Sequence, residues 1–297
     1  MSARRISVRV PATSANLGPG FDCLGLALDL WGQLTFSVSS QAAASPENGV
    51  SRLASEAFRR LFLNLRQEPP VGLVVDYDGA VPVARGLGAS AVVRAAGLLA
   101  ANAFLGEPLD REQLLVLGAE LEGHADNVAP ALFGGLQVVA YDGDSVHHVA
   151  VPVPDKLGLV LFIPDFPMST QRSRRLLPQK LSRGDAVYNI GRAALLVGSL
   201  AAGRLDPDLV GAAIQDRLHQ PARSRLFPAM YALFTAAREA GALGAYLSGS
   251  GSTICALTVS NQEAIAEAME KTALKRGVKG RIIITSPTAR GAELVES

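Results

Sequence analysis

The chain of 297 residues contains very little lysine, and none of it in the first half. The lysines are Lys156, Lys180, Lys271, Lys275 and Lys279, so residues 1–155 contain none. A phosphate-binding site in that half must therefore use backbone N–H groups, arginine or a metal ion. The pattern GxxxxGK[ST], in which a lysine reaches the phosphates, is excluded there and does not appear later. A protein-kinase catalytic loop is also missing.

Cysteine and long apolar runs are scarce as well. Cys23 and Cys255 are far apart and form no C-x-x-C pair, which favours free thiols in a reducing compartment. The best apolar run, 95–105, is too short to span a bilayer and contains Asn102. The N-terminus lacks the apolar segment of a signal peptide. We therefore expect a cytoplasmic protein with no membrane partner.

Charge of either sign is nearly balanced. Lys and Arg number 28 and Asp and Glu 27, which gives a net charge of +1, and aromatic residues make up only 5%. This composition argues against a nucleic-acid partner. The apolar share of 48% excludes a disordered chain, and the length suits one large domain or two smaller ones.

The hydrophobic pattern predicts an α+β architecture. A proline-rich segment near residue 150 suggests two domains, 1–153 and 154–297. The segment 11–22, rich in Gly, Pro, Ser and Asn, is expected to be a loop. The expected strands are 6–10, 34–38, 73–77, 136–141 and 159–163. The expected helices are 50–65, 90–105, 110–123 with Asp110 as N-cap, 186–201, 207–218 and 228–240. The chain is expected to end as strand–loop–strand–helix–strand.

A glycine-rich turn, PVARGLGASAVV, leads directly into a predicted helix. Gly86 and Gly88 can adopt positive φ and allow close backbone approach to a ligand. The first N–H groups of a helix are unpaired and lie at its positive end, so they bind phosphate without lysine. An ordinary tight turn between a strand and a helix would explain the same residues.

Polar residues crowd into the end of the third predicted helix and the segment that follows it. The group is Glu120, Glu122, His124, Asp126 and Asn127. Magnesium prefers oxygen ligands, usually one or two carboxylates together with phosphate oxygens, and Glu122 or Asp126 could supply one. Asp126 and Asn127 could equally cap a short helix, and His124 could make a core hydrogen bond.

Three other segments have both a functional and a plain structural interpretation. Asn16 and Asp22 are strongly polar residues within the small-residue segment 10–29, which could also be a structural loop. YLSGSGST at 246–253 could line a phosphate, but a hairpin explains it better. Arginines that could clamp a carboxylate, or lie on a solvated face, are Arg172, Arg174, Arg175, Arg223 and Arg225. His147 and His148 are expected on the surface.

The order of these segments resembles the GHMP kinases, and within them the homoserine kinases most closely. The resemblance rests on TSANLGPGFD, GLGAS, HADNVAPALFGG and SGSGS, in this order over nearly the whole chain. It implies a two-domain GHMP kinase fold, with an N-terminal mixed α/β domain, a ferredoxin-like C-terminal domain and the site between them. It also implies ATP and Mg²⁺ as cofactors, L-homoserine as substrate in threonine biosynthesis, and a homodimer.

The resemblance implies a role for each matched residue. The ATP loop would comprise Pro82, Val83, Ala84, Arg85, Gly86, Leu87, Gly88, Ala89, Ser90, Ala91 and Val92. Ser90 and Glu122 would hold the metal. The substrate side would comprise Asn16, Asp22, His124, Asp126, Asn127, Arg174 and Arg223, and the residues acting in catalysis would be Asn127, Asp126 and Arg174.

The chemistry of homoserine agrees with these roles. Its ammonium needs an acceptor such as Asp22, and its carboxylate needs a guanidinium fork such as Arg174 with Arg223. Its hydroxyl needs orientation by Asn127 or Asp126. Alternatives are a related kinase for another small alcohol and a catalytically inactive sensor of ATP or amino acids.

Two departures from the family pattern leave details open. Ala89 stands where the usual loop has a serine, so one hydroxyl contact is lost. Asn127 stands where relatives such as mevalonate kinase have an aspartate base, and asparagine cannot take a proton. The short spacing from Glu122 to Asn127 also leaves Glu120 as an alternative metal ligand.

Overall fold

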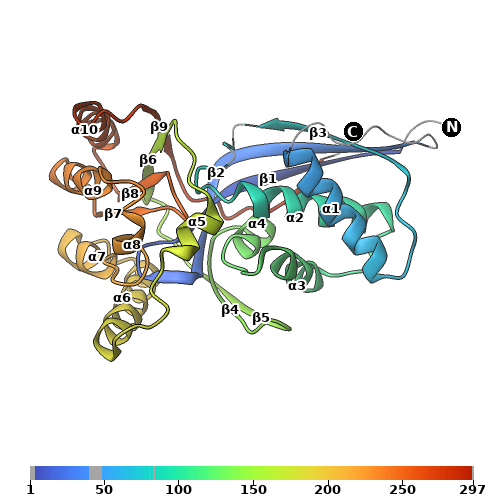
Figure 1. The fold of residues 1–297 in the computed structure, drawn as a ribbon, viewed down its shortest axis with the longest axis horizontal. Coiled ribbons are helices and arrows are strands. Elements are labelled where there is room, and N and C mark those ends of the chain that lie inside the picture. Colours follow the sequence, from blue (N-terminus) through green and yellow to red (C-terminus); the bar gives the residue numbers. More distant parts are fainter. Residues whose placement is uncertain (1–3, 40–48, 80, 83, 296–297) are drawn as a thin grey trace.

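The computed structural model describes residues 4–39, 49–79, 81–82 and 84–295. They form two α+β layers, each built on one antiparallel sheet, which lie end to end (Figure 1). Val83 of the expected ATP loop lies outside the described residues.

The first layer holds most of the N-terminal half. Its strands are β1 (Arg4–Asn16), β2 (Gly20–Ser39), β3 (Gly72–Gly79), β4 (Leu136–Tyr141), β5 (Val146–Val151) and β10 (Glu293–Val295). They run in the order β10-β1-β2-β4-β5, with β3 also paired to β2. Its helices are α1 (Gly49–Asn64), α2 (Ala89–Phe104), α3 (Arg111–Glu122) and α4 (Val128–Phe133). The helices cover one face of the sheet, and stacked Phe36, Phe58 and Phe62 lie in the core between them.

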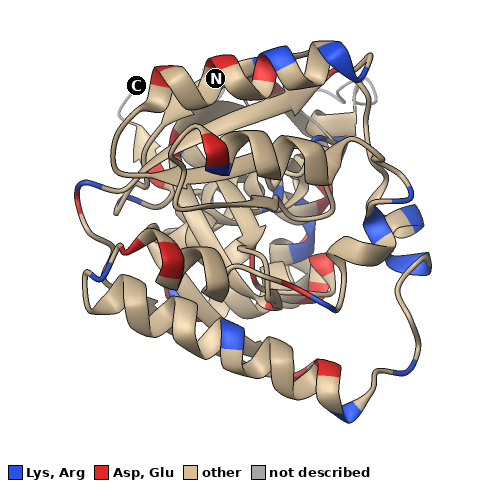
Figure 2. Cartoon of the chain, turned by 90° about the vertical axis from the view of Figure 1, so that its left-hand side faces the viewer, with Lys and Arg blue, Asp and Glu red and all other residues tan. Residues whose placement is uncertain are grey.

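The second layer has the strand order of a ferredoxin-like fold. Its strands are β6 (Gly158–Pro164), β7 (Gly244–Leu247), β8 (Ile254–Thr258) and β9 (Gly280–Thr285), in the order β7-β8-β6-β9. Its helices are α5 (Thr170–Arg175), α6 (Arg183–Ala201), α7 (Pro207–Ala213), α8 (Gln220–Arg223), α9 (Met230–Glu239) and α10 (Gln262–Lys275). α9 and α10 pack on the sheet, whereas α6, the long helix at the bottom of Figure 2, has few charged residues and contacts α7, β2 and β5.

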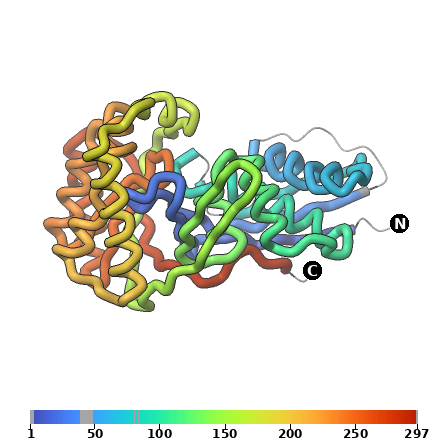
Figure 3. Tube along the Cα trace, turned by 90° about the horizontal axis from the view of Figure 1, so that it is seen from below, coloured from blue at the N-terminus to red at the C-terminus, as the bar shows by residue number. Residues whose placement is uncertain are grey.

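A shared apolar core joins the two layers. Leu17 and Leu24, from the turn region between β1 and β2, belong to the same buried cluster as Leu159, Ile214 and Tyr246 of the second layer. Figure 3 shows this blue turn region reaching into the yellow and orange half of the chain. The C-terminal strand β10 returns to pair with β1. The two layers are therefore in direct contact where the substrate and ATP loops were expected to meet.

Most elements lie where the hydrophobic pattern predicts them. Asp110 caps α3 through a capping box with Gln113, as expected. The closing β7–β8–α10–β9 order is confirmed, and so is the hairpin at 246–253. No helix among the described residues is long and apolar enough to cross a membrane.

Three expectations are wrong. Segment 11–22 is mostly strand, because β1 continues through Pro11 to Asn16 and absorbs the proline at a register shift. The helix expected to reach residue 218 ends at Ala213. His148 is not a surface residue: its ring packs 4.4 Å from that of Phe133, and its nitrogens contact Gln137 and Glu112.

The two cysteines are free thiols, as expected. Burial, together with the charges of Asp126 and Asp22, raises the pKa of Cys23 to about 11. Burial likewise raises the pKa of Cys255 to about 11. Both thiols are therefore protonated and unreactive near neutral pH.

Candidate active site

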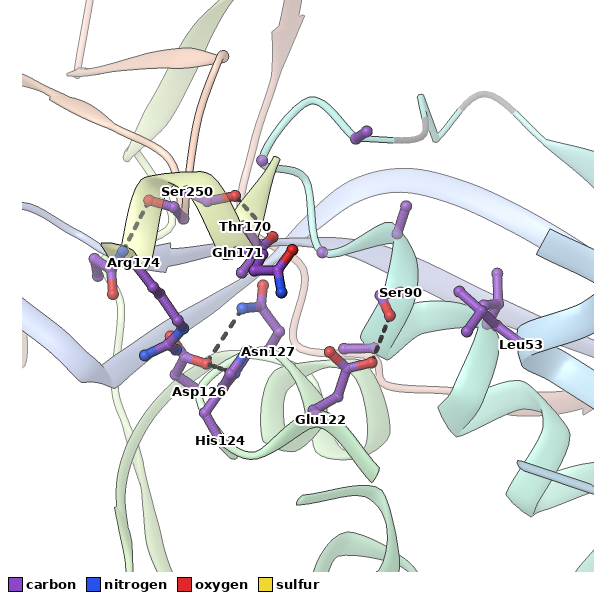
Figure 4. A pocket seen from close by; sticks show the side chains of 18 of the residues that line it. Leu53, Ser90, Glu122, His124, Asp126, Asn127, Thr170, Gln171, Arg174 and Ser250 are labelled. Carbon is purple, nitrogen blue, oxygen red and sulfur yellow. Dashed lines mark hydrogen bonds and ion pairs between the residues drawn. The ribbon is translucent and has the colours of Figure 1, made fainter. Parts of the chain in front are cut away.

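A cavity of about 520 Å³ lies between the two layers. One end is formed by charged side chains near α5 and α8, and the other by the start of α1 and α2 (Figure 4). Most of the expected site residues line it: Asn16, Asp22, Ala84, Gly86, Gly88, Ala89, Ser90, Ala91, Glu122, His124, Asp126, Asn127, Arg174 and Arg223. Residues from the four separate sequence segments thus meet in one cleft.

The glycine-rich turn is shaped by two left-handed residues. Gly86 has φ 80° and Gly88 has φ 67°. A Cβ on Gly86 would lie 2.2 Å from the Ser248 carbonyl oxygen, and one on Gly88 would lie 1.8 Å from Thr13 Oγ1. Only glycine fits these two positions. The turn therefore presents the unpaired N–H groups of the first turn of α2 to the cavity, at the positive end of the helix.

The hairpin motif supports this turn from behind. Ser248 Oγ donates a hydrogen bond of 2.6 Å to the Gly86 carbonyl, and the Thr253 N–H donates to the Arg85 carbonyl. Ser248 is also bonded to Ser14 Oγ at 2.8 Å. Gly249 and Ser250, at the tip, line the cavity. The motif is thus both a hairpin and part of the cleft.

Ser90 and Glu122 lie side by side, as two ligands of one metal ion would. Ser90 Oγ is 2.6 Å from Glu122 Oε1, and the Glu122 side chain is only 8% exposed (Figure 4). The guanidinium of Arg94 donates to Ser90 Oγ and to Glu122 Oε1. Glu120, the alternative ligand, pairs instead with Arg60 at 3.1 Å and does not line the cavity. The oxygen donors of Ser90 and Glu122 therefore fit a magnesium ion that completes its shell with phosphate oxygens and water.

A hydrogen-bonded chain runs along the floor of the cavity. Thr13 Oγ1 donates to Asn127 Oδ1 at 2.8 Å, and Asn127 Nδ2 donates to Asp126 Oδ1 at 3.2 Å. Asp126 Oδ1 is also 2.6 Å from His124 Nδ1. Asn127 occupies the N-cap position of α4 but makes no capping bond. Burial opposes a charge on His124, but the carboxylates of Asp126, Glu122 and Asp22 outweigh it and raise the His124 pKa.

The end of the cavity near α5 and α8 is built around a carboxylate and two guanidinium groups. Arg174 pairs with Asp22 through two bonds of 2.8 Å each. Burial disfavours the charge of Arg174, but its bonds to Asp22 prevail and raise its pKa. Asn16 accepts from the Asp22 N–H at 3.0 Å and donates to the Gly249 carbonyl, so it fixes the Asp22 loop. Arg174 and Arg223 both lie over the ring of Phe21.

A fully buried histidine, His219, accepts a hydrogen bond from Arg223 and helps to hold it in place. The Arg223 side chain donates to the Gly249 carbonyl at 2.7 Å and to His219 Nδ1 at 3.0 Å, while His219 Nε2 donates to the Gly18 carbonyl. Desolvation, with the nearby charge of Arg174, lowers the Arg223 pKa to about 10. Desolvation also lowers the His219 pKa to about 4, so the imidazole is neutral. Both His219 and Arg223 are thereby fixed in orientation.

Other expected residues do not reach the cavity. Pro82, Arg85, Leu87 and Val92 are absent from its lining. Arg85 donates to the carbonyls of Pro164 and Asp165, and the side chains of Leu87 and Val92 are buried in the core. Of the expected basic cluster, Arg172, Arg175 and Arg225 also do not line it.

Several residues of the site were not expected from the sequence. Val50, Leu53 and Val93 form an apolar part of the lining, and Thr170 and Gln171 of α5 lie beside Arg174. Thr13, Arg94, Asp216 and His219 support lining residues from outside. Only Arg94 carries a signal in the sequence, because it is a charged residue inside an Ala-rich helix.

Comparison with known proteins agrees with this geometry. The family models "GHMP kinases N terminal domain" and "GHMP kinases C terminal" match residues 50–135 and 198–275. A homoserine kinase of Moorella thermoacetica is 43% identical, over 97% of this chain and 99% of its own. The crystal structure of homoserine kinase from Cytophaga hutchinsonii superposes with a TM-score of 0.87 and 30% identity, over 98% of this chain and 97% of that chain.

A more distant structure shares the fold alone. The mevalonate kinase of Methanococcus jannaschii has a TM-score of 0.67 at 15% identity, over 96% of this chain and 99% of that chain. The fold and the two domain matches define the class as the GHMP kinases, which are ATP-dependent phosphotransferases. Within this class the chain belongs to the homoserine kinase family.

Proposed function

We propose that the chain transfers the γ-phosphoryl group of ATP to the side-chain hydroxyl of L-homoserine and releases O-phospho-L-homoserine and ADP. One observation carries the proposal. A single cavity has Asp22, Arg174 and Arg223 at one end and the phosphate turn with Ser90 and Glu122 at the other. An amino acid and a nucleotide triphosphate can therefore meet inside it.

The nucleotide would bind at the α2 end. The N–H groups at the start of α2 would donate hydrogen bonds to the phosphates, so no lysine is needed in this half. Ser90 and Glu122 would hold Mg²⁺, which neutralises charge on the transferred phosphoryl group when bound. Val50, Leu53 and Val93 offer the apolar wall against which an adenine would pack.

The amino acid would bind by rearranging the Asp22–Arg174 pair. Each partner is satisfied by the other through two hydrogen bonds. The ammonium of homoserine would take the place of the guanidinium at Asp22, and its carboxylate would take the place of Asp22 at Arg174, with Arg223 as the second cation. The site thus selects a zwitterion, whereas an isoprenoid alcohol or a sugar would leave both charges unmatched.

Asn127 would orient the reacting hydroxyl. The Oδ1 of Asn127 accepts a hydrogen bond from Thr13, and this bond fixes the orientation of the amide and therefore the direction of Nδ2. The amide of Asn127 cannot take a proton. Asp126 already accepts bonds from His124 and Asn127. We therefore assign the hydroxyl proton to the transferred phosphate or to water. Abolished turnover in Asp126→Asn, with ATP and homoserine binding intact, would indicate a side-chain base instead.

Substrate choice tests the function directly. ADP release should be measured with homoserine, mevalonate, galactose and shikimate at equal concentrations. Homoserine should exceed the others by orders of magnitude. A larger rate with another alcohol would make the chain a GHMP kinase for that alcohol, and equal background with all of them would favour an inactive sensor.

Two further expectations stay predictions: a homodimer and a cytoplasmic location. The outer side of α6 supports the first, because Val187 and Ile190 are 63% and 69% exposed there. Light scattering of the purified chain would give the mass in solution, and an unchanged monomer mass over a wide concentration range would contradict the dimer.

A further inference from the structure

Arg94 lies directly behind the proposed metal ligands. It is one turn after Ser90 in α2, and its guanidinium donates to both Ser90 Oγ and Glu122 Oε1. Its side chain is only 17% exposed. Glu122 is the one acid to which an ion pair joins Arg94 among the described residues, so the cluster of Ser90, Arg94 and Glu122 carries no net charge.

A buried cation at position 94 is unfavourable unless a neighbouring acid, here Glu122, compensates its charge. Positive charge in the first turns of a helix opposes the helix dipole, and burial removes the water that would solvate it. The Nε–H of Arg94 is buried without a hydrogen-bond partner. The contacts with Glu122 and Ser90 therefore have to hold the side chain, and both Ser90 Oγ and Arg94 donate to the same oxygen of Glu122, Oε1.

We propose that Arg94 is a positioning residue that makes metal binding depend on nucleotide. This inference rests on the proposed function for the role of Glu122. Arg94 neutralises and orients Glu122 in the free enzyme, so a free divalent cation meets a carboxylate that is already paired. The triphosphate adds negative charge beside the neutralised Glu122, and the metal binds only together with it.

Binding of Mn²⁺, as a spectroscopic substitute for Mg²⁺, tests this without turnover. The enzyme without nucleotide should be titrated with Mn²⁺ while free Mn²⁺ is followed by electron paramagnetic resonance. Arg94→Met should bind Mn²⁺ about tenfold or more tightly than the wild type, because the competing charge is gone. Arg94→Lys, which keeps the charge, should bind weakly like the wild type. Arg94→Gln replaces Arg94→Met if the latter does not fold.

A matched control uses Glu120, which lies in α3 two residues before Glu122. Arg60 of α1 pairs with Glu120 at 3.1 Å outside the cavity, so Arg60→Met also removes a guanidinium paired with an acid of α3 and should leave Mn²⁺ affinity unchanged. Adding Glu122→Gln to Arg94→Met should abolish the gained affinity. With a non-hydrolysable ATP analogue present, the wild type and Arg94→Met should differ less than they do without it.

Equal Mn²⁺ affinity of the wild type and Arg94→Met would overturn the proposal, and so would a gain that survives Glu122→Gln. Neither result depends on which alcohol is phosphorylated. A chain that phosphorylates homoserine but shows no Mn²⁺ effect loses only the role of Arg94. A chain that shows the Mn²⁺ effect but ignores homoserine loses only the proposed substrate.

Discussion

His219 shows how a single buried residue can fix a binding group and make stability depend on pH. Its Nε2–H is committed to the Gly18 carbonyl, and its Nδ1 accepts from Arg223. Asp216, whose oxygens accept from Asn189 and from the backbone of residues 218–220, holds the same segment. Protonation of Nδ1 would place one cation against another inside a dry core. The neutral ring is therefore part of the machinery that presents Arg223.

The first prediction concerns the pH dependence of folding. Because the His219 pKa falls from 6.5 to about 4 on folding, the unfolded chain binds more protons between these values. Its contribution to the free energy of unfolding is complete above pH 6.5 and is lost as the pH falls toward 4, by about 3 kcal/mol in total. Urea unfolding at several pH values should show a shallower pH dependence for His219→Gln, which can keep both hydrogen bonds but cannot titrate. Parallel curves for wild type and variant would contradict this.

The second prediction separates the two ends of the cavity. Arg174→Gln should raise the KM for homoserine by about tenfold or more, because it removes one of the two cations proposed to bind the homoserine carboxylate. The KM for ATP should change by less than about twofold. Arg172→Gln is the matched control, since Arg172 belongs to the same short helix but does not line the cavity. Steady-state kinetics with each substrate varied would decide, and a defect confined to ATP would place Arg174 at the nucleotide.

At the scale of elements, the start of α2 depends on a turn that other segments hold in place. β1 supplies Thr13 and Ser14, and the β7–β8 hairpin supplies Ser248, so the turn is packed from both layers. The close approach leaves no room for a side chain at Gly88. The geometry that exposes the helix amides is thus imposed from outside α2.

The third prediction tests this packing with two glycines of similar conformation. Gly88 and Gly106 have φ of 67° and 82°, but a Cβ on Gly106 would meet nothing within 4 Å. Both alanine variants should lose about 1 kcal/mol of stability from the backbone strain alone. Gly88→Ala should also displace Thr13 and Asn127 and weaken ATP binding by about tenfold or more. Isothermal titration with ATP and Mg²⁺ should show normal affinity in Gly106→Ala, and an equal effect of the two changes would refute the packing argument.

The sequence predicted local features well and long-range contacts poorly. GLGAS and HADNVAP were recognisable because turn chemistry and clustered polar residues are local signals. Segment 11–22 was mistaken for a loop, because its Gly and Pro content gives no sign that a strand with a bulge continues through it. The bond from Thr13 to Asn127 joins residues 114 positions apart, and such pairs follow from topology, which a single sequence does not encode locally.

At the scale of the whole molecule, the cavity exists because the two layers share a core. Leu17 and Leu24 of the first layer are buried against Leu159, Ile214 and Tyr246 of the second. The expected domain boundary after residue 153 stays a prediction. β10, near residue 295, pairs with β1 and so ties the end of the chain to the first layer. Separating the halves would expose this apolar surface and dismantle the site.

The last prediction is that the chain unfolds as one unit. Trp31, the single tryptophan, lies in β2 of the first layer, whereas far-UV circular dichroism reports helices in both layers. Urea transitions from the two probes should coincide, because loss of either layer uncovers the shared core. A saturating ATP analogue with Mg²⁺ and homoserine should move both transitions together, by about 3 kcal/mol at a hundredfold excess over Kd for one ligand. A fluorescence transition that shifts alone, or precedes the other, would show that the layers fold independently and that the cavity forms only when they dock.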